Sequence, residues 1–195
     1  MLNTTPERME DIHFINALIE DVAANHTVDT SRIYGIGYSL GSMFSYEFAC
    51  QMSDQFAAIA SFAGTMPVNP TNCDPQRFAP IMHIHGTDDS IIAYDNEWGW
   101  KRWPQVGNMR DIPRLLSYWR DKYQCTDDQE TAGANATHFV YGGCAQNVRV
   151  EHYRIGGAGH GWPNRLNGTS THQVMWNFLS EFRMDRGGAP ETSTP

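Results

Sequence analysis

The sequence has 195 residues, 41% hydrophobic and 18% charged, a composition typical of one globular domain and too short for two comfortable ones. The formal net charge of −8 argues against nucleic acids or anionic membranes as partners, since both attract clustered lysine and arginine. No apolar run approaches the ~18 residues of a membrane span, and residues 1–11 lack the apolar core of a secretion signal. We expect one catalytic domain over residues 1–185 and a flexible polar tail over 186–195.

Hydrophobic periodicity predicts alternating helices and strands along this domain. In chain order the predicted elements are a helix over 6–25 with one broad buried face, a strand over 32–38, a helix over 41–52, a strand over 56–64, a loop over 67–80, a strand over 81–85, a helix over 112–123, a strand over 147–155 and a helix over 173–182. This alternation predicts the α/β class, with a mostly parallel sheet that is covered by helices on both faces.

Residues 37–41 read Gly-Tyr-Ser-Leu-Gly, the G-x-S-x-G pattern, where a predicted strand ends and a predicted helix begins. A nucleophile elbow requires this order of strand, sharp turn and helix. Gly37 and Gly41 would relieve a strained backbone and let the helix pass close to the strand. The turn would push the Ser39 hydroxyl out of the sheet's carboxyl edge and aim the Leu40 amide at a developing oxyanion. Ser39 is therefore the predicted nucleophile, and Leu40 is the predicted oxyanion donor.

The glycines of this segment allow a second interpretation. Gly35, Gly37 and Gly41 could form a turn that cradles the pyrophosphate of a dinucleotide. A dinucleotide fold needs an Asp or Glu at the end of the next strand, but residues 60–64 there read Ala-Ser-Phe-Ala-Gly. The sequence therefore favours the nucleophile elbow, and we expect no cofactor.

A serine nucleophile needs a histidine base, and the base needs an acid that fixes its tautomer. In α/β-hydrolases the acid and then the histidine follow the serine, each after a strand. The strand over 81–85 runs into Gly-Thr-Asp88-Asp89, and the strand over 147–155 runs into a glycine-rich loop that contains His160. A histidine in such a loop has no packing reason to be there. The order predicts a catalytic triad of the serine, His160 and one of the two acids.

Four further histidines have weaker functional interpretations. His83 and His85 lie two residues apart on one strand face, a spacing that could bind a metal, but no third ligand is evident nearby. We therefore expect them to be structural and expect no metal site. His152 stands within a strand and is expected to be structural, whereas His172, near the start of the last helix, is the alternative base.

Aromatic residues suggest how a substrate could bind. Trp98, Trp100 and Trp103 stand in the loop after the candidate acid, and Trp162 follows the candidate base, so both loops leave the carboxyl edge of the sheet. A flat aromatic surface suits a sugar ring, a hydroxycinnamoyl group or a polyester chain. The clustered tryptophans could instead cover the core under a long loop. Our candidate substrate-binding residues are Tyr38, Trp98, Trp100 and Trp162.

Four cysteines, an even number, bear on the environment of the chain. Cys50, Cys73, Cys125 and Cys144 form no CxxC pair and no zinc spacing with histidine, so two disulfides and four buried thiols remain open alternatives. Sequons for N-glycosylation begin at Asn3, Asn25, Asn135 and Asn167 and suggest exposed polar loops.

The stretches DIHFINALIEDVAANHTVDTSRIYGIGYSLGSM, FAAIASFAGT, HIHGTDDSIIAYD and GGAGHGWP run across most of the chain. They resemble the secreted esterases grouped as polyhydroxybutyrate depolymerase and feruloyl esterase-like proteins. The resemblance implies an α/β-hydrolase fold and selects Asp89 over Asp88, because the family's acid ends a His-Gly-Thr-x-Asp motif. The family motif Gly-x-Gly-His-x-Trp-Pro falls on His160.

The resemblance also implies a disulfide pairing and a location. Similar proteins carry cysteines before and after the segment that leads to the last strand, which implies a Cys125–Cys144 bond and leaves Cys50 to pair with Cys73. It further implies a secreted or periplasmic protein.

Two departures from the resembling family bear on activity. Gly-Ser stands at 41–42 where the family often has Gly-Gly, and the family's first strands, whose loop supplies a second oxyanion amide, have no counterpart. We expect an N-terminally truncated fold with an unpaired strand edge that favours homo-oligomers. Loss of one oxyanion donor is expected to cost about 10²–10³ in rate.

These observations predict a serine carboxylic ester hydrolase that acts through an acyl-enzyme. The expected substrates are feruloyl or acetyl esters of plant polysaccharide, or short polyhydroxyalkanoate and aliphatic esters. The alternatives are a peptidase or acyltransferase of the same fold, and a catalytically weak or inactive chain.

Overall fold

Residues 9–99 and 106–185 are described by the structure, a computed structural model. The helices are α1 (Glu10–Asn25), α2 (Leu40–Gln51), α3 (Ile112–Tyr123) and α4 (Thr171–Ser180), with 3₁₀ turns at Thr30–Arg32 and Ala145–Asn147. The strands are β1 (Tyr34–Tyr38), β2 (Ala58–Phe62), β3 (Ile81–Gly86), β4 (Trp98–Gly99), β5 (Asn108–Met109), β6 (Asp127–Ala132), β7 (Thr137–Gly142), β8 (Val150–Ile155), β9 (Arg165–Leu166) and β10 (Thr169–Ser170).

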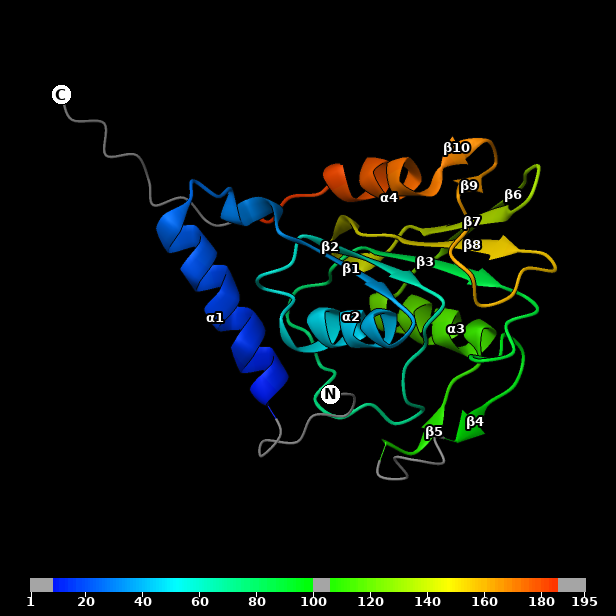
Figure 1. The fold of residues 1–195 in the computed structure, drawn as a ribbon, viewed down its shortest axis with the longest axis horizontal. Helices are drawn as coiled ribbons and strands as arrows, with labels where there is room; N and C mark the ends of the chain where they lie inside the picture. Colours follow the sequence, from blue (N-terminus) through cyan, green and yellow to red (C-terminus); the bar gives the residue numbers. More distant parts are fainter. Residues whose placement is uncertain (1–8, 100–105, 186–195) are drawn as a thin grey trace.

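The main sheet contains six strands in the order β1–β2–β3–β8–β7–β6. The first four are parallel, whereas β7 is antiparallel to β8 and β6 is antiparallel to β7. Helices α2 and α3 lie against one face of this sheet and α4 lies against the other (Figure 1). The predicted α/β class is confirmed, and the parallel strands bring their carboxyl ends to one common edge.

Side chains of the central strands divide the core into two layers. Ile59 of β2 and Ile81 of β3 belong to the layer under α2 and α3, whereas Phe62 and Ile84 belong to the layer under α4. All five residues of β2 and all six of β3 are buried. Strands covered on both faces have nearly continuous apolar sequences, and this is why both could be predicted.

Helix α1 differs in its packing from the helix that the sequence predicts. Ile12 is its single buried residue, and Ile15 is partly buried against the same core layer. Phe14, Leu18 and Val22, spaced four residues apart on one face, expose 65%, 45% and 40% of their surface. The predicted broad buried face is therefore wrong, because α1 lies along the side of the molecule and reaches the core with one narrow edge (Figure 1).

The hairpin of β6 and β7 extends the sheet beyond β8 and is missing from the predicted elements. All six residues of β6, Asp-Asp-Gln-Glu-Thr-Ala, are exposed, and such residues carry no strand signal. β7, Thr-His-Phe-Val-Tyr-Gly, does contain β-branched and aromatic residues. That run is the signal from which the hairpin could have been found.

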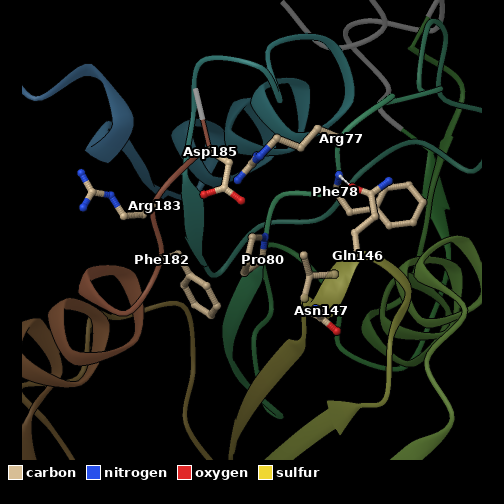
Figure 2. A pocket seen from close by; sticks show the side chains of 9 residues that line it. Arg77, Phe78, Pro80, Gln146, Asn147, Phe182, Arg183 and Asp185 are labelled. Carbon is tan, nitrogen blue, oxygen red and sulfur yellow. Dashed lines mark hydrogen bonds between the residues drawn. The ribbon is translucent and has the colours of Figure 1, made fainter. Parts of the chain in front are cut away.

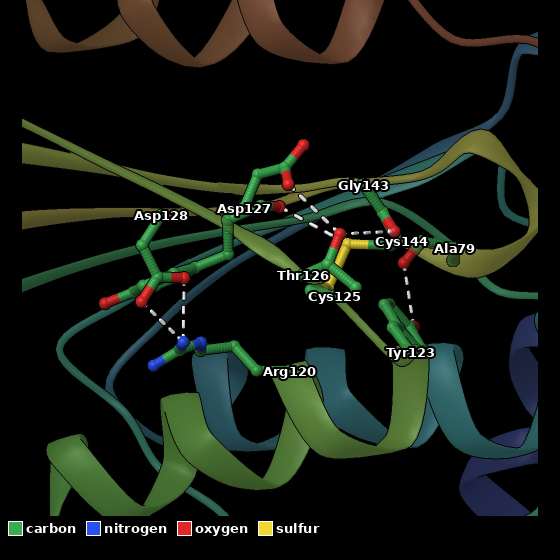
Figure 3. Close-up of a disulfide and its surroundings, with 10 residues drawn as sticks. Ala79, Arg120, Tyr123, Cys125, Thr126, Asp127, Asp128, Gly143 and Cys144 are labelled. Atoms are coloured by element: carbon green, nitrogen blue, oxygen red, sulfur yellow. Dashed lines mark hydrogen bonds and ion pairs between the residues drawn. A yellow bond between two sulfur atoms is a disulfide. The ribbon is translucent and has the colours of Figure 1, made fainter.

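A disulfide between Cys125 and Cys144 closes the open end of this hairpin (Figure 3). Cys125 stands just before β6 and Cys144 just after β7, so the bond joins the outer ends of the two strands. Beside it, Arg120 of α3 binds both carboxylate oxygens of Asp128 at 2.7 and 2.6 Å. The disulfide and this ion pair fix the hairpin to the end of α3.

A second disulfide, Cys50–Cys73, joins the last turn of α2 to the loop that precedes β3. The Cys73 carbonyl also accepts a hydrogen bond from Lys122 Nζ at 2.8 Å. All four cysteines are therefore in disulfides, paired as the resemblance implies, and the alternative of four buried thiols is wrong.

Removing the Cys50–Cys73 bond with a Cys50→Ser, Cys73→Ser double variant is expected to lower the free energy of unfolding by about 3 kcal/mol. The reason is that the unfolded chain regains the freedom of a loop whose ends are 23 residues apart. Urea denaturation measures the loss, and the matched Cys125 and Cys144 double variant, with a separation of 19 residues, should lose nearly as much. Equal unfolding free energies for variant and parent would contradict the entropic explanation.

Strand β1 lies at one edge of the sheet. Among the described residues its single neighbour is β2. Ile36 in the middle of β1 is 55% exposed. An apolar strand edge of this kind can pair with another strand, so self-association through β1 stays a prediction.

Two other expectations concern the chain end and membranes. The polar tail expected over 186–195 lies outside the described residues. Within 9–99 and 106–185, no helix combines the length and the apolar character that crossing a membrane would need.

Candidate active site

Ser39 occupies the turn between β1 and α2, where its backbone is strained. Its φ of 55° and ψ of −117° are rare for a residue with a side chain. Ser39 N–H donates to Phe62 O at 2.9 Å, and Ser39 O accepts from Met43 N–H at 3.0 Å in the first turn of α2. Hydrogen bonds to the neighbouring strand and to the helix therefore hold the turn in the geometry of a nucleophile elbow.

Gly37 permits the close approach between this turn and α2. A Cβ there would lie 2.1 Å from Gly41 O and 2.4 Å from Ser45 Oγ. Gly64, just beyond β2, is similarly confined, since its Cβ would lie 2.2 Å from Ser42 Oγ. A Cβ on Gly41, by contrast, would meet nothing within 4 Å. The steric explanation offered for both glycines of the motif therefore holds for Gly37 and is wrong for Gly41.

The loops that follow β3 and β8 are joined to each other. Thr87 N–H donates to Ile155 O at 3.0 Å, and Asp88 N–H donates to Ala158 O at 2.9 Å. A Cβ on Gly86 would lie 2.2 Å from Ala158 O, so glycine is needed for this contact. The acid and the histidine that these loops carry are thereby held close to one another.

Ser39, Asp89 and His160 come together in one hydrogen-bonded row. His160 Nε2 lies 2.8 Å from Ser39 Oγ, and His160 Nδ1 lies 2.7 Å from Asp89 Oδ2. Because a carboxylate can only accept, Nδ1 carries the proton and Nε2 can accept the proton of the serine hydroxyl. Asp88 is exposed, and its Oδ1 accepts from the Thr87 hydroxyl at 3.1 Å. Of the two candidate acids, Asp89 is the one in contact with the imidazole.

The Asp89 carboxylate is buried and hydrogen-bonded through both oxygens. Oδ1 accepts from the N–H groups of Ile91 at 2.8 Å and Ile92 at 2.9 Å. Oδ2 contacts His160 Nδ1 and lies 3.2 Å from His85 Nε2. Burial raises the pKa of Asp89, but the interactions with His85, Ile92, His160 and Ile91 outweigh burial and hold that pKa below its ordinary value. Asp89 is therefore negatively charged at neutral pH.

Leu40, the candidate oxyanion donor, is the first residue of α2. The first N–H groups of a helix have no carbonyl partner within the helix, and they carry partial positive charge. The Leu40 side chain is 49% exposed, so solvent reaches this end of α2. The amide is thus adjacent to the serine and suited to an anionic oxygen.

Aromatic rings surround the imidazole. Tyr38 stacks on Phe62 and packs against His160, with ring centroids 5.4 Å apart in both pairs, and its hydroxyl donates to His160 O at 2.5 Å. Trp162 meets Tyr38 edge-on at 6.0 Å and packs against His172 at 5.4 Å. Tyr38 therefore connects the end of β1 to the loop that carries His160. His172, the alternative candidate base, lies against Trp162, whereas Ser39 contacts His160.

The tryptophans that follow the acid are described in part. Trp98, in β4, packs against a small apolar cluster that includes Met43 and Met109. Trp100 and Trp103 lie outside the described residues. Trp98 therefore helps to cover core side chains, and its contact with a substrate stays a prediction.

A family model of the dienelactone hydrolases matches residues 1–101, a stretch that includes the elbow at Ser39 and reaches past Asp89. The chain belongs to the dienelactone hydrolase family. This result agrees with the sequence resemblance to esterases of the α/β-hydrolase fold.

Curated relatives of this dienelactone hydrolase family chain include two fungal esterases. The chain is 26% identical over 183 residues to a bifunctional acetylxylan esterase/xylanase from Neocallimastix patriciarum; the aligned region covers 90% of this chain and 24% of that protein. The chain is 27% identical over 180 residues to feruloyl esterase B from Piromyces equi, and the aligned region covers 90% of this chain and 32% of that protein. The chain therefore spans about a quarter to a third of the length of these relatives.

Two solved structures with a similar fold are esterases. An acetyl xylan esterase from Aspergillus awamori superposes with a TM-score of 0.60 at 12% identity, covering 86% of this chain and 66% of that one. A thermostable esterase superposes with a TM-score of 0.53 at 14% identity, covering 90% and 37%. At these identities the likeness establishes the fold, which is the α/β-hydrolase fold.

Three buried imidazoles stack in one group, and one of them, His85, contacts Asp89. Sequence reasoning missed how they are connected. His83 and His85 of β3 and His152 of β8 are at most 1% exposed. The ring of His83 stacks on that of His85 at 5.2 Å and on that of His152 at 5.5 Å. Among the described residues, no group of three or more His, Cys, Asp or Glu side chains is arranged to hold a metal ion. The available signal was the spacing of His83 and His85, which places both side chains on the same face of β3.

Burial keeps two of these imidazoles, His83 and His152, neutral. Burial, together with His85 and His152, holds the pKa of His83 well below its ordinary value. Burial also lowers the pKa of His152 from 6.5 to about 3, against a hydrogen bond with His83 O that raises it. His152 Nδ1 lies 3.1 Å from that carbonyl and its Nε2 lies 2.9 Å from the Tyr94 hydroxyl, so Nδ1 donates and Nε2 accepts.

The free energy of unfolding is expected to fall as the pH decreases from about 6.5 towards 3. In that range unfolded histidine binds a proton that folded His152 does not bind, so each such group lowers stability by up to about 1.4 kcal/mol per pH unit. Urea denaturation at several pH values measures the slope, which a His152→Gln variant should make shallower. A slope unchanged in His152→Gln would contradict the assignment.

Two asparagines fasten the turn of the β6–β7 hairpin to the loop that follows His160. Asn135 Nδ2 donates to Arg165 O at 3.0 Å, and Asn167 Nδ2 donates to Ala136 O at 3.0 Å. Asn135 Oδ1 also accepts from Asn167 N–H at 2.7 Å. This Asn135–Asn167 clasp holds β9 and β10 against the hairpin and so restrains the segment that follows His160.

A cavity of about 320 Å³ lies at the amino-terminal ends of the parallel strands, whereas Ser39 lies at their carboxyl ends (Figure 2). It is lined by residues that precede β3 and β8 or follow α4, namely Arg77, Phe78, Pro80, Gln146, Asn147, Val148, Phe182, Arg183 and Asp185. The Arg77 guanidinium donates to the carbonyls of Ser53, Phe56 and Ala57 at 2.7–3.0 Å, so it binds backbone. Because the cavity and Ser39 lie at opposite ends of the parallel strands, the cavity is separate from the hydrogen-bonded row of Ser39, His160 and Asp89.

Proposed function

We propose that this chain is a serine carboxylic ester hydrolase. In the proposal Ser39 is the nucleophile, His160 is the general base and then the general acid, and Asp89 orients His160 and stabilises its charged form. The observation that carries it is the continuous row of contacts, 2.8 Å from Ser39 Oγ to His160 Nε2 and 2.7 Å from His160 Nδ1 to Asp89 Oδ2. Membership of a hydrolase family and esterase relatives support it.

The proposed reaction has two acyl-transfer steps. His160 accepts the Ser39 hydroxyl proton as Oγ attacks the ester carbonyl, and the imidazolium then gives that proton to the departing alcohol, leaving an acyl-serine. A water molecule next gives a proton to His160 and attacks the acyl group, and the acid departs as the proton returns to Ser39 Oγ. The Leu40 amide would donate to the oxyanion in both tetrahedral intermediates. The negative charge of Asp89 would stabilise His160 whenever it is protonated.

The proposed substrates are acetyl and feruloyl esters of plant polysaccharide. Relatives named acetylxylan esterase and feruloyl esterase support this class. Tyr38 is 42% exposed and lies beside Trp162 and His160, so its ring offers a flat surface next to the reacting serine. Aromatic surfaces of this kind bind sugar rings and cinnamoyl groups.

A labelling and turnover experiment tests the proposal. The chain is treated with a fluorophosphonate, the labelled peptide is located by mass spectrometry, and hydrolysis of p-nitrophenyl acetate, methyl ferulate and acetylated xylan is measured. We expect the label on Ser39, hydrolysis of p-nitrophenyl acetate, and loss of that hydrolysis in step with labelling. Ser42 and Ser45 serve as internal controls, since their hydroxyls bond to Ser61 Oγ and to Gly41 O and not to His160.

Each other outcome has a distinct meaning. Labelling of Ser39 with negligible turnover would support the alternative of a catalytically weak chain. Cleavage of peptides, or acyl transfer to alcohols in preference to water, would favour the peptidase or acyltransferase alternative. Absence of label at Ser39 in folded protein would contradict the proposed nucleophile.

We also propose that the protein acts in an oxidising compartment, outside the cell or in a periplasm. Two disulfides, Cys50–Cys73 and Cys125–Cys144, support this location, because such bonds persist where thiols are not kept reduced. Mass spectrometry of protein from its natural source, without added reductant, should find both bonds.

A further inference from the structure

His85 is a buried group that the proposed mechanism leaves unused. Its Nε2 lies 3.0 Å from Ile92 O and 3.2 Å from Asp89 Oδ2. Ile92 N–H in turn donates to Asp89 Oδ1 at 2.9 Å. His85 Nε2 therefore contacts both the Asp89 carboxylate and the backbone of Ile92, which donates to the other carboxylate oxygen.

The acceptors around His85 determine where its proton lies. Both neighbours of Nε2 are acceptors, so neutral His85 carries its proton on Nε2, and its Nδ1 accepts. His83 Nε2, 3.1 Å from His85 Nδ1, must then donate, and His83 Nδ1 accepts from the Tyr46 hydroxyl at 2.7 Å. Tyr46, His83 and His85, which we call the buried imidazole chain, thus form hydrogen bonds that all run in one direction, towards Asp89.

Two imidazoles, those of His85 and His160, share the Asp89 carboxylate. Asp89 already faces His160, which becomes positive during acyl transfer, and a single carboxylate shared by two imidazolium ions would stabilise each of them less. Burial also holds the pKa of His83 well below its ordinary value and raises the pKa of Tyr46. The Tyr46 hydroxyl therefore stays protonated and able to donate.

We propose that His85 is a positioning residue of the active site, whose Nε2–H holds the Asp89 carboxylate and the backbone at Ile92 in the orientation that His160 requires. The buried imidazole chain keeps that proton on Nε2. The expected effect of His85 on rate rests on the proposed function, whereas its effect on the contact between Asp89 and His160 does not.

Three variants test the assignment through activity. His85→Leu removes the donor, His85→Gln keeps an N–H donor, and His152→Leu is the matched control, because His152 is equally buried and contacts His83 but not Asp89. For p-nitrophenyl acetate we expect kcat to fall about 10- to 100-fold in His85→Leu with KM within twofold, and most of kcat to return in His85→Gln. His152→Leu should retain the kcat of the parent.

Nuclear magnetic resonance supplies a readout that does not depend on turnover. The low-field signal of the His160 Nδ1 proton, assigned by its loss in His160→Gln, reports the contact with Asp89. It should persist in His152→Leu and His85→Gln and should shift or broaden in His85→Leu. In ¹⁵N-histidine-labelled parent protein, His85 should carry its proton on Nε2, a measurement that needs no variant to fold.

The outcomes separate the inference from the proposed function. A proton on His85 Nδ1 in the parent, or a parent-like kcat and an unchanged His160 signal in folded His85→Leu, would overturn the positioning role. Equal losses of kcat in His85→Leu and His152→Leu would overturn it too, since they would indicate a general effect on packing. An inactive parent that still shows the expected signals would contradict the proposed function and support the positioning role.

Discussion

Replacing Ser39 by alanine is expected to lower kcat for ester hydrolysis by about 10⁶-fold, with KM nearly unchanged. The variant removes the Oγ that lies 2.8 Å from His160 Nε2, so no acyl-serine can form. Residual turnover would come from water activated by His160 next to a bound substrate. Stopped and continuous assays with p-nitrophenyl acetate measure kcat, and fluorophosphonate labelling should disappear in the same variant.

Ser45→Ala is the matched control for this prediction. Ser45 lies further along the same helix, and its hydroxyl donates to Gly41 O at 3.0 Å without contact to the imidazole. We expect its kcat to stay within about twofold of the parent, as for a substitution that removes one neutral hydrogen bond. A Ser39→Ala protein that retains a tenth of the parent kcat would exclude Ser39 as the nucleophile.

Replacing Asp89 by asparagine is expected to lower kcat by about 10⁴-fold. The N–H groups of Ile91 and Ile92 donate to Oδ1, so the asparagine oxygen should take that position and turn its NH₂ group towards His160 Nδ1. An NH₂ donor there would move the imidazole proton to Nε2, where it would block acceptance of the serine proton. The same NH₂ group would also face the Nε2–H of His85, donor against donor.

The neighbouring acid provides the control for Asp89→Asn. Asp88→Asn also removes one negative charge, but at an exposed residue whose carboxylate contacts the Thr87 hydroxyl. Its kcat should therefore stay within about twofold of that of the parent. Kinetic assays with both variants, together with urea denaturation to verify folding, decide between the two acids. Loss of turnover in Asp88→Asn with retention in Asp89→Asn would reverse the proposed assignment.

Parts of the fold with strong local signals could be predicted from the sequence. The continuous apolar runs of β2 and β3 and the amphipathic period of α3, which is capped by Asp111, mark these elements without tertiary information. β6 could not be recognised, because its exposed polar residues are strand-forming only through pairing with β7 and through the Cys125–Cys144 bond. The exposed face of α1 was equally hidden, since periodicity reveals an apolar face but not what covers it.

The candidate site likewise has a part that could be predicted from the sequence and a part that could not. Ser39, Asp89 and His160 could be named from the sequence because each follows a strand and stands in a recognisable motif, and they lie within hydrogen-bonding distance in the structure. The link from His83 through His85 to Asp89 depends on side-chain directions and on the backbone turn at residues 91–92. No spacing rule contains that information, so two histidines on one strand face could suggest a metal as readily as a row of hydrogen bonds.

The Asn135–Asn167 clasp has a consequence for how the protein is produced, because both asparagines begin glycosylation sequons. An oligosaccharide attached to either Nδ2 would replace one of the two hydrogens on the nitrogen that donates to Arg165 O or to Ala136 O, and its bulk would hold the hairpin turn apart from β9 and β10. Yeast or filamentous fungal hosts would therefore yield material with a loosened segment after His160. A bacterial periplasm, which forms disulfides without modifying these sequons, would yield the closed form.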